Sequence, residues 1–283
     1  MKNDTFDFLE DKNDGLDDFC SMIFDFAKNN PNEFRNYYPY IKEISELNIP
    51  DTVIVPLTSN FIKCICLEKF NEDIYLKFTN YILEKINEKE FTLSRDLFIK
   101  DGKFSNKFNF SSAYIPNGEI DTIGKKSMEI LYGDMCLHDF PSTDIIIREF
   151  VHTSYKRPSI YFGMKLNTEF RVFYNFDKNE IMDIVNYWDY DTMINNLFDK
   201  KIQTPEGPID IFDKTIFLSV GKEIENDYLK LKPKLKNLIN DILPNVNLKG
   251  EYSLDFLWDG EKFRLIDMAI ASQSYYYDKV KKK

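Results

Sequence analysis

Residues 251–268 read EYSLDFLWDGEKFRLIDM, and this stretch predicts a β-hairpin. Two apolar runs flank Asp259-Gly260, a dipeptide typical of hairpin turns. Each run carries one aspartate, Asp255 in the first and Asp267 in the second. A carboxylate among apolar residues is costly unless it is paired or bound to a metal. The hairpin is therefore a candidate site for Mg²⁺, which prefers oxygen ligands; two satisfied structural aspartates are the alternative.

The parity of the hairpin decides whether both aspartates can serve one metal ion. In an antiparallel pair, directly opposed residues share a face of the sheet, and faces alternate along each strand. With a regular two-residue loop at Asp259-Gly260, Asp255 opposes Arg264 and Asp267 points to the other face. A shared metal site therefore requires a loop with an odd number of residues, or a β-bulge that resets the parity.

A second predicted strand, which precedes the hairpin in the chain, carries two charged residues. The alternation over 169–176 predicts a strand, and 181–188 is its expected antiparallel partner. Glu169 and Arg171 share one face of that strand, since side chains alternate between faces. An arginine beside a carboxylate suits an anion site next to a cation site, and a cross-strand ion pair on a solvated sheet face is the alternative.

A lysine cluster follows an earlier predicted strand. Residues 96–100 read DLFIK, and a polar loop with Lys103 and Lys107 comes after them. A lysine such as Lys100, which leaves a buried strand beside a small-residue loop, can place its ammonium group on a phosphate; ordinary surface lysines are the alternative. The Lys-x-Asp-Gly pattern of nucleic-acid ligases is not met, because Lys100 directly precedes Asp101.

The composition excludes several classes of protein. The chain has 283 residues with 43% hydrophobic and 16% aromatic content, which excludes a disordered chain. The net charge of −10 argues against a general duplex nucleic-acid surface, which needs clustered Lys and Arg. No window approaches the roughly 18 apolar residues of a membrane span, and the acidic N-terminus has no apolar signal region.

The cysteines and histidines indicate no metal centre. The cysteines show neither a CxxC pair nor zinc spacing, and we expect reduced thiols in a cytoplasmic protein. They are Cys20, Cys64, Cys66 and Cys136. The two histidines, His138 and His152, are too few and too separate for a zinc site. Two expectations concern the N-terminal part: 61–67 reads as a strand, and Asn71 as the cap of a helix.

The order of these motifs over residues 93–272 resembles the ATP-grasp superfamily. A strand ending in Lys100 comes first, followed by an apolar strand into 148–151, the strand with Arg171 and the hairpin at 251–268. The chain resembles in particular the divergent phage and bacterial ATP-grasp proteins of the R2K clade. It is also distantly similar to a eukaryotic ATP-grasp factor that assembles a translation initiation complex.

The resemblance implies an α+β fold in which two α+β subdomains grip a nucleotide. It implies an N-terminal region over 1–92, similar to the pre-ATP-grasp domain of the family. A central subdomain over 93–158 would carry the nucleotide lysine and a hinge. A C-terminal subdomain over 159–283 would carry the catalytic sheet and the metal hairpin.

The resemblance also implies a set of site residues and the cofactors ATP and Mg²⁺. Arg171 would touch the γ-phosphate, Lys107 is a further catalytic candidate, and Asp255 with Asp267 would hold the metal. The residues expected to bind the nucleotide come from the lysine cluster, the hinge and the catalytic strand. They are Lys100, Lys103, Glu149, Phe150, Val151 and Glu169.

The implied activity is an ATP- and Mg²⁺-dependent ligase that joins a carboxylate to an amine through an acyl phosphate. Its substrate would be a small molecule or peptide, such as an amino acid. One position departs from the family, because the hairpin of the family ends acid-x-Asn and this chain has Ala269 there. Ser272 or Ser274 could compensate. The departure favours the alternative function, an ATP-binding assembly factor or chaperone for a protein partner with little or no ligase activity.

Overall fold

A computed structural model describes residues 14–104, 106, 110–138, 142–198, 203–204, 207–208 and 211–282. The chain forms two compact units. The first contains the described residues within 1–36, 51–106 and 112–150, and the second contains those within 37–50, 107–111 and 151–283. Each unit combines helices with an antiparallel sheet, which confirms the α+β class. The division into three domains stays a prediction.

The first unit is built on a four-stranded antiparallel sheet in the order β1-β4-β2-β3. The strands are β1 (Thr52–Pro56), β2 (Leu97–Asp101), β3 (Tyr114–Ile115) and β4 (Asp144–Glu149). Strand β1 pairs with β4, so the N-terminal part of the chain extends this sheet. One face is apolar at its centre, where Ile99 and Ile147 lie opposite one another and are fully buried.

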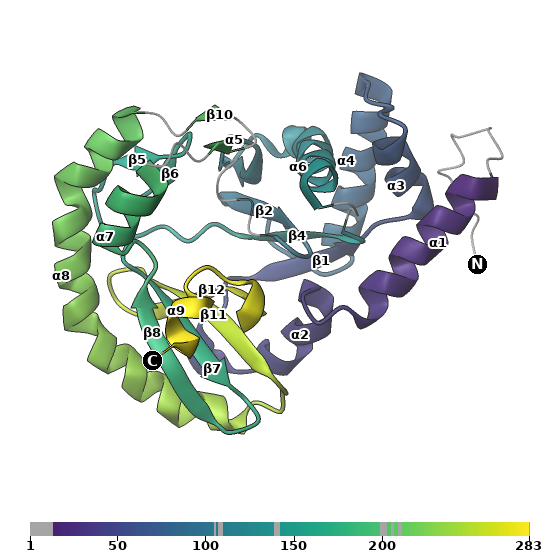
Figure 1. The fold of residues 1–283 in the computed structure, drawn as a ribbon. Coiled ribbons are helices and arrows are strands. Elements are labelled where there is room, and N and C mark those ends of the chain that lie inside the picture. Colours follow the sequence, from purple (N-terminus) through teal and green to yellow (C-terminus); the bar gives the residue numbers. More distant parts are fainter. Residues whose placement is uncertain are drawn as a thin grey trace. The chain divides into compact units, whose positions relative to one another are not determined.

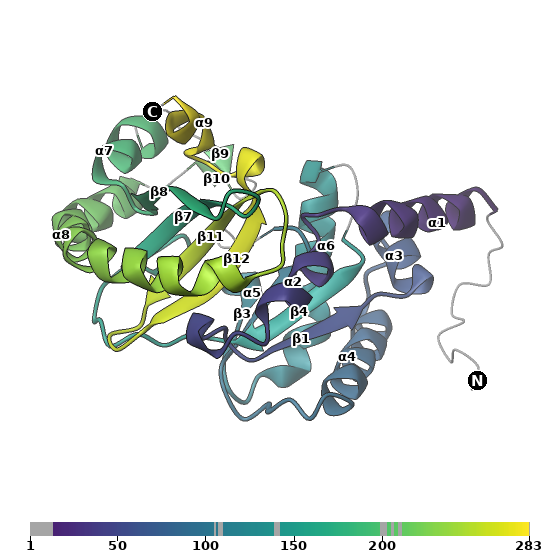
Figure 2. The same ribbon diagram turned by 90° about the horizontal axis from the view of Figure 1, so that it is seen from below.

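Helices cover this apolar face, as Figure 2 shows for α4. The helices of the first unit, including α2 and α5 that begin or end in the second, are α1 (Asp14–Asn29), α2 (Phe34–Ile41), α3 (Ser59–Cys66), α4 (Glu72–Asn87), α5 (Phe110–Ala113), a 3₁₀ turn (Ile120–Thr122) and α6 (Ile123–His138). Helix α4 begins as expected, because the Asn71 side chain accepts a hydrogen bond of 3.0 Å from the Ile74 amide.

The strand expected over 61–67 is wrong, because these residues form α3. Phe61, Ile62 and Ile65 are fully buried and lie at helical spacing, which the short apolar run also allows. Lys63 forms an ion pair with Asp17 of α1. Cys20 and Cys64 are buried free thiols, whereas Cys136 is exposed.

The second unit is built on a four-stranded antiparallel sheet in the order β12-β11-β7-β8. Its strands are β7 (Glu169–Asn175), β8 (Glu180–Asn186), β11 (Glu251–Trp258) and β12 (Phe263–Ile270). The predicted pairing of β7 with β8 and the predicted hairpin are confirmed. Two short pairs complete the strands: β5 (Ser159–Ile160) with β6 (Met164–Lys165), and β9 (Gln203–Thr204) with β10 (Gly207–Pro208).

One long helix covers one face of this second sheet. Helix α8 (Ile211–Ile242) runs along β7 and β8 and curves in Figure 1. Pro233 lies inside α8, where it removes one helical hydrogen bond and favours a bend. The rings of Tyr228 on α8 and Phe170 on β7 pack with centroids 5.4 Å apart.

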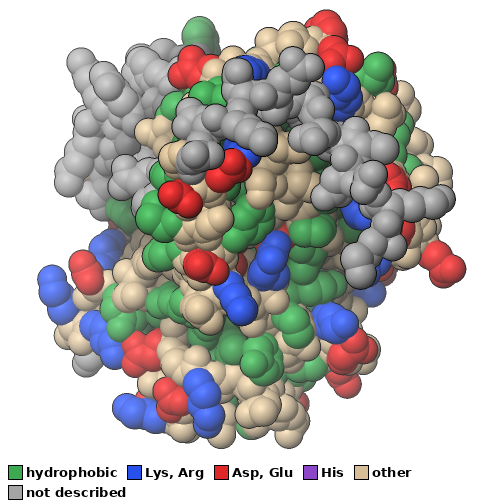
Figure 3. Space-filling model, turned by 90° about the vertical axis from the view of Figure 1, so that its right-hand side faces the viewer, with side chains coloured by type: hydrophobic (Ala, Val, Ile, Leu, Met, Phe, Trp, Pro, Cys, Tyr) green, Lys and Arg blue, Asp and Glu red, His purple; other side chains and the backbone are tan. Residues whose placement is uncertain are grey.

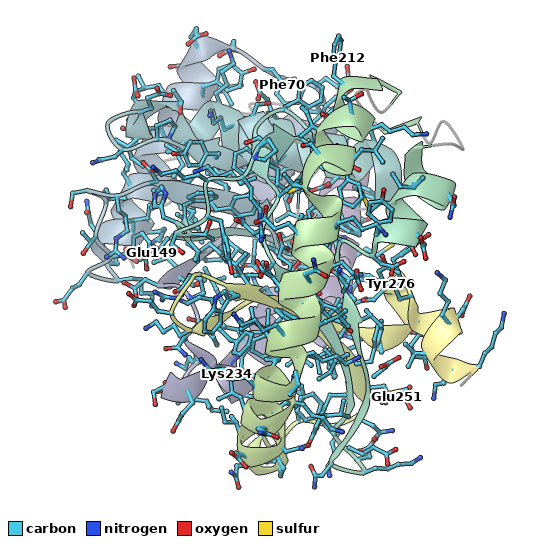
Figure 4. The ribbon with its side chains drawn as sticks, turned by 90° about the vertical axis from the view of Figure 1, so that its left-hand side faces the viewer. Phe70, Glu149, Phe212, Lys234, Glu251 and Tyr276 are labelled. Carbon is cyan, nitrogen blue, oxygen red and sulfur yellow. The ribbon has the colours of Figure 1, made fainter. Side chains whose placement is uncertain are left out.

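Short helices complete the second unit. They are a 3₁₀ turn (Ser45–Leu47), α7 (Tyr190–Thr192), a π-helical segment (Met193–Phe198), two 3₁₀ turns (Leu243–Asn245 and Ala271–Gln273) and α9 (Tyr277–Lys281). Glu251 at the start of β11 holds α9, since its carboxylate accepts from Tyr277 at 2.7 Å and pairs with Lys281 at 2.9 Å (Figure 4). Helix α9 therefore lies against the sheet.

The surface carries charges of both signs. Lys and Arg side chains are interspersed with Asp and Glu over the face that Figure 3 displays. None of the helices in the described part of the chain combines the length and the apolar composition of a membrane span.

Candidate functional site

A β-bulge in the hairpin places both aspartates on one face of the sheet. Trp258 opposes Phe263, so four residues, 259 to 262, form the loop, and with an even loop alone the two aspartates would face opposite sides. The register shifts next to Asp255, however, and Asp255 directly opposes Asp267. The extra residue is Ile266. A metal site shared by both aspartates required a loop with an odd number of residues or a β-bulge, and the hairpin has the β-bulge.

Arg171 joins the two aspartates on the same face. It lies opposite Asp255 on the neighbouring strand β7. Its Nε and Nη2 donate to the two carboxylate oxygens of Asp255, each at 2.8 Å. This bidentate pair is strong and fixes the orientation of both groups. The cross-strand ion pair of the alternative is thus present with Asp255 as the partner of Arg171, but on a largely buried sheet face rather than on a solvated one.

The electrostatics of Arg171 reflect these two carboxylates. Burial lowers the pKa of the Arg171 guanidinium, but the charge and hydrogen bonds of Asp255 outweigh it and raise the pKa above its ordinary value. The charge of Asp267 adds to the increase, so Asp267 is close enough to act on the guanidinium. The Tyr187 ring lies 4.8 Å from the guanidinium carbon and favours the cation further.

Glu169 lies on the same face of β7 but has a different environment. It is buried, and its carboxylate accepts a hydrogen bond of 3.3 Å from the Trp188 indole. The structure thus brings Arg171, Asp255 and Asp267 together. The carboxylate of Glu169 is instead bound to the Trp188 indole.

The sheet face of the two aspartates also carries a serine hydroxyl opposite Ala269. Ala269 opposes Ser253, which shares the face of Asp255 two residues away. The Ser253 hydroxyl is 2.5 Å from that of Ser274, one of the two serines considered as substitutes. Ser253 was missed as a candidate, although strand alternation from Asp255 places it on the same face.

The donor set fits Mg²⁺ only if a phosphate shares the ion. Proteins commonly hold Mg²⁺ through one or two carboxylates plus substrate phosphates. A carboxylate has about four acceptor positions, and Arg171 uses two on Asp255. In the described part of the chain, no three His, Cys, Asp or Glu side chains gather closely enough to hold a metal. Asp255 and Asp267 would therefore hold the ion together with a nucleotide.

Lys100 lies in a pair of buried cations in the first unit. It shares its sheet face with Arg148, because Phe98 opposes Arg148. Both side chains are buried, and the Phe34 ring lies 5.7 Å from the Lys100 ammonium and 5.2 Å from the Arg148 guanidinium. Phe34 and Arg148 were missed as site residues. No pattern in 144–149 marks Arg148, because three isoleucines follow one another there and the shared face depends on the register between β2 and β4.

Lys103 lies in the loop after Lys100, beside buried acids. Its amide donates to the Asp101 carboxylate at 2.7 Å. Burial raises the pKa of Glu33 to about 7, against the opposing charge of Lys103. The charge of Lys103 therefore acts on acidic neighbours within its own unit. Lys107, the other predicted catalytic lysine, lies outside the described residues.

The predicted hinge lies at the boundary between the two units. The first unit ends at Phe150 and the second resumes at Val151. The Phe150 amide donates to the backbone carbonyl of Asp96 at 2.9 Å, and Glu149 pairs with Arg95 at 3.2 Å. The nucleotide-binding roles of Glu149, Phe150 and Val151 stay predictions.

Comparisons with known proteins give only distant structural similarities. No protein-family profile and no curated protein sequence match the chain. Among solved structures, Cdc123 from Schizosaccharomyces pombe is 14% identical, over 88% of this chain and 89% of that one, with a TM-score of 0.47. A RimK-domain ATP-grasp protein from Sphaerobacter thermophilus is 9% identical over 84% and 57% of the two chains, with a TM-score of 0.38.

A third similar structure is D-alanine–D-alanine ligase from Bacillus anthracis. It is 8% identical, over 84% of this chain and 56% of that one, with a TM-score of 0.38. Because these TM-scores lie below 0.5, the family of the chain is a proposal that rests on its own residues.

Proposed function

We propose that the chain is a divergent ATP-grasp protein, an ATP- and Mg²⁺-dependent ligase that joins a carboxylate to an amine through an acyl phosphate. Its substrate is a small molecule or peptide, such as an amino acid. The proposal includes a cytoplasmic location, which the buried free thiols of Cys20 and Cys64 support.

One observation carries the proposal: Arg171, Asp255 and Asp267 share one sheet face through a β-bulge. A bulge bends the strand and disrupts the ladder locally, and bulges are over-represented next to active sites. Here the bulge turns an apolar hairpin into one with two opposed carboxylates beside an arginine. An arginine next to a pair of carboxylates is the combination that phosphoryl transfer from a metal-bound nucleotide needs.

Each residue has a defined role in the proposal. Asp255 and Asp267 hold Mg²⁺, which would offset negative charge on the phosphate oxygens when bound. Arg171 stabilises the negative charge on the phosphoryl group during its transfer, and this interaction is strongest in the transition state. Lys100 of β2, whose ammonium group lies 5.7 Å from the Phe34 ring, binds a nucleotide phosphate.

A second candidate function is an ATP-binding assembly factor with little turnover. Two observations favour it: the bidentate bond of Arg171 to Asp255, and Ala269 in place of a metal-binding asparagine. A nucleotide phosphate would have to compete with Asp255 for the guanidinium. A protein that holds ATP without cleaving it needs no such exchange.

Turnover assays separate the two functions. We would incubate the full chain with ATP and Mg²⁺, add amino acids and peptides in turn, and measure ADP and phosphate together with the product mass. The ligase predicts substrate-dependent ADP release and a product heavier than either substrate. Binding of ATP without ADP release for any substrate would instead support the assembly factor.

A further inference from the structure

A small cavity lies at the free edge of the sheet in the second unit. It has a volume of about 250 Å³ and is bordered by edge strand β8, by α8 and by the C-terminal segment around Tyr276. Figure 4 labels Tyr276, which belongs to this segment and lines the cavity together with residues of α8. We call this cavity the edge cavity. Ligand pockets usually measure about 300–1,000 Å³, so the edge cavity suits a compound no larger than an amino acid.

At this edge, side chains already form hydrogen bonds with the backbone carbonyl and amide of Ile184 in β8. The Ile184 carbonyl accepts hydrogen bonds from the Tyr228 hydroxyl at 2.6 Å and from the Lys232 ammonium at 2.7 Å. The Ile184 amide donates to the carboxylate of Asp183 at 2.8 Å. An added β-strand would need these groups. The edge cavity is therefore closed to strand pairing and open to a small molecule.

The charges that line the edge cavity favour a cation. Three carboxylates, those of Asp183, Asp189 and Glu225, face two ammonium groups, those of Lys232 and Lys279. One negative charge remains, which a monocation would neutralise. The three carboxylates, after burial, also raise the pKa of the Tyr228 hydroxyl, as expected where the potential is negative.

Two of these carboxylates are held by neutral donors. Glu225 accepts from the side-chain amide of Asn186 at 2.7 Å, and Asp189 accepts from the backbone amide of Thr192 at 2.9 Å. Among the described residues, neither carboxylate forms an ion pair. Both are thus fixed in orientation before any cation binds, which lowers the cost of binding.

Aromatic rings complete the surroundings of a cation. The lysines of the cavity rest on its tyrosines, Lys232 at 5.3 Å from the Tyr228 ring and Lys279 at 5.4 Å from the Tyr276 ring. The cavity lining thus already holds two ammonium groups of the chain by cation–π contact. A metal ion fits less well, since no set of three metal-ligating side chains gathers in the described part of the chain.

We propose that the edge cavity binds a small primary ammonium compound, the class that includes free amino acids. Carboxylates at Asp189 and Glu225 accept hydrogen bonds from the ammonium group, and Lys279 lies within the same cavity to meet a carboxylate of the ligand. The residues that line the edge cavity do not include Arg171, Asp255 or Asp267, and the proposal does not depend on the ligase function.

Calorimetry with three matched probes tests the proposal on the full chain without ATP. Propylamine carries only the ammonium group, propionate only the carboxylate, and alanine both. We expect propylamine and alanine to bind and propionate not to bind. Lack of propylamine binding at millimolar concentration, or equal binding of propionate, overturns the proposal.

A variant pair assigns the binding to the edge cavity. Glu225→Gln removes the charge while it keeps an acceptor for Asn186, and it should weaken propylamine binding about tenfold or more, as expected when a charged hydrogen bond is lost. Glu223→Gln is the control, because Glu223 is an exposed glutamate on α8 that pairs with Arg157 at 2.9 Å and does not line the cavity. Equal affinities of the two variants would place the amine elsewhere and contradict the assignment.

Discussion

Arg171 makes two bonds that only a planar guanidinium can make together. Lysine keeps the positive charge but presents a point charge on a flexible stem, so it cannot reproduce the bidentate contact with Asp255. If Arg171 acts on transition-state charge, Arg171→Lys lowers kcat about tenfold to a hundredfold and changes the KM for ATP little. Steady-state ADP release measures both constants.

Arg264→Lys is the matched control for this substitution. Arg264 also forms an arginine–aspartate pair, with Asp259 at 2.8 Å, but at the hairpin loop. It should leave kcat within about twofold of the starting value, as surface substitutions usually do. A loss of melting temperature in Arg171→Lys with full activity per folded molecule would show that the Arg171 pair is structural.

Asp134 makes the stability of the first unit depend on pH. Burial and the neighbouring charge of Asp101 raise the pKa of Asp134 to about 9, while Asn106 donates to it at 3.0 Å and Lys103 opposes the increase. The folded state therefore holds the Asp134 proton more tightly than the unfolded state. The stabilisation is complete below the ordinary carboxyl range and is lost as pH rises through the raised value.

Asp134→Asn should flatten this pH dependence. One proton contributes a slope of about 1.4 kcal/mol per pH unit, which asparagine cannot contribute because it does not titrate. We expect the melting temperature of the unchanged protein to fall more from about pH 5 to about pH 8 than that of the variant. Asp121→Asn, at an exposed position, is the control. Parallel curves for Asp134→Asn and the unchanged protein would contradict the raised pKa.

The candidate site depends on the hairpin of β11 and β12. Hydrogen bonds within the hairpin loop and to Ser154 fix the conformation of that loop. Asp259 accepts from the amides of Glu261 and Lys262, each at 2.9 Å, and its carbonyl accepts from the Ser154 amide at 2.9 Å. Gly260 follows with φ of +115°, and a Cβ there would overlap the Ser154 side chain. The loop thus requires glycine for its conformation and for its contact.

Gly260→Ala should destabilise the second unit more than Gly250→Ala. Gly250 also has a positive φ, +93°, but its nearest neighbour to an added Cβ is at 3.9 Å. A left-handed conformation alone costs a non-glycine residue about 1–2 kcal/mol, so Gly250→Ala should lose that much. Denaturant unfolding should show a larger loss for Gly260→Ala. Equal losses would mean that the contact with Ser154 is unimportant.

The sequence predicted those parts of the molecule in which local pattern and burial agree. Alternation in 169–176 and the Asp259-Gly260 turn signal gave the paired strands of the second sheet. The run 61–67 was misread, because its six apolar residues around Lys63 fit both a strand and a short buried helix. The packing of this run against α1 stabilises the helix rather than the strand.

The candidate site was predictable only in outline. Parity reduced the metal hypothesis to a bulge or an odd loop, but no residue in 262–268 marks Ile266 as the bulged position. The Arg171–Asp255 bond depends on the register between β7 and β11, whose paired residues are 76 or more positions apart in the chain. Such long-range pairing leaves no local signal, and the same holds for Lys100 and Arg148 around Phe34.

Titration of ATP into the full chain by calorimetry, with and without Mg²⁺, is the decisive test of the proposed nucleotide and metal site. We predict Mg²⁺-dependent ATP binding that Asp267→Asn weakens about tenfold or more, since one carboxylate of the proposed metal site is lost. Asp241→Asn, at an exposed position near the end of α8, should bind as the unchanged protein does. Lack of binding at millimolar ATP, or binding that neither Mg²⁺ nor Asp267→Asn affects, would contradict the account.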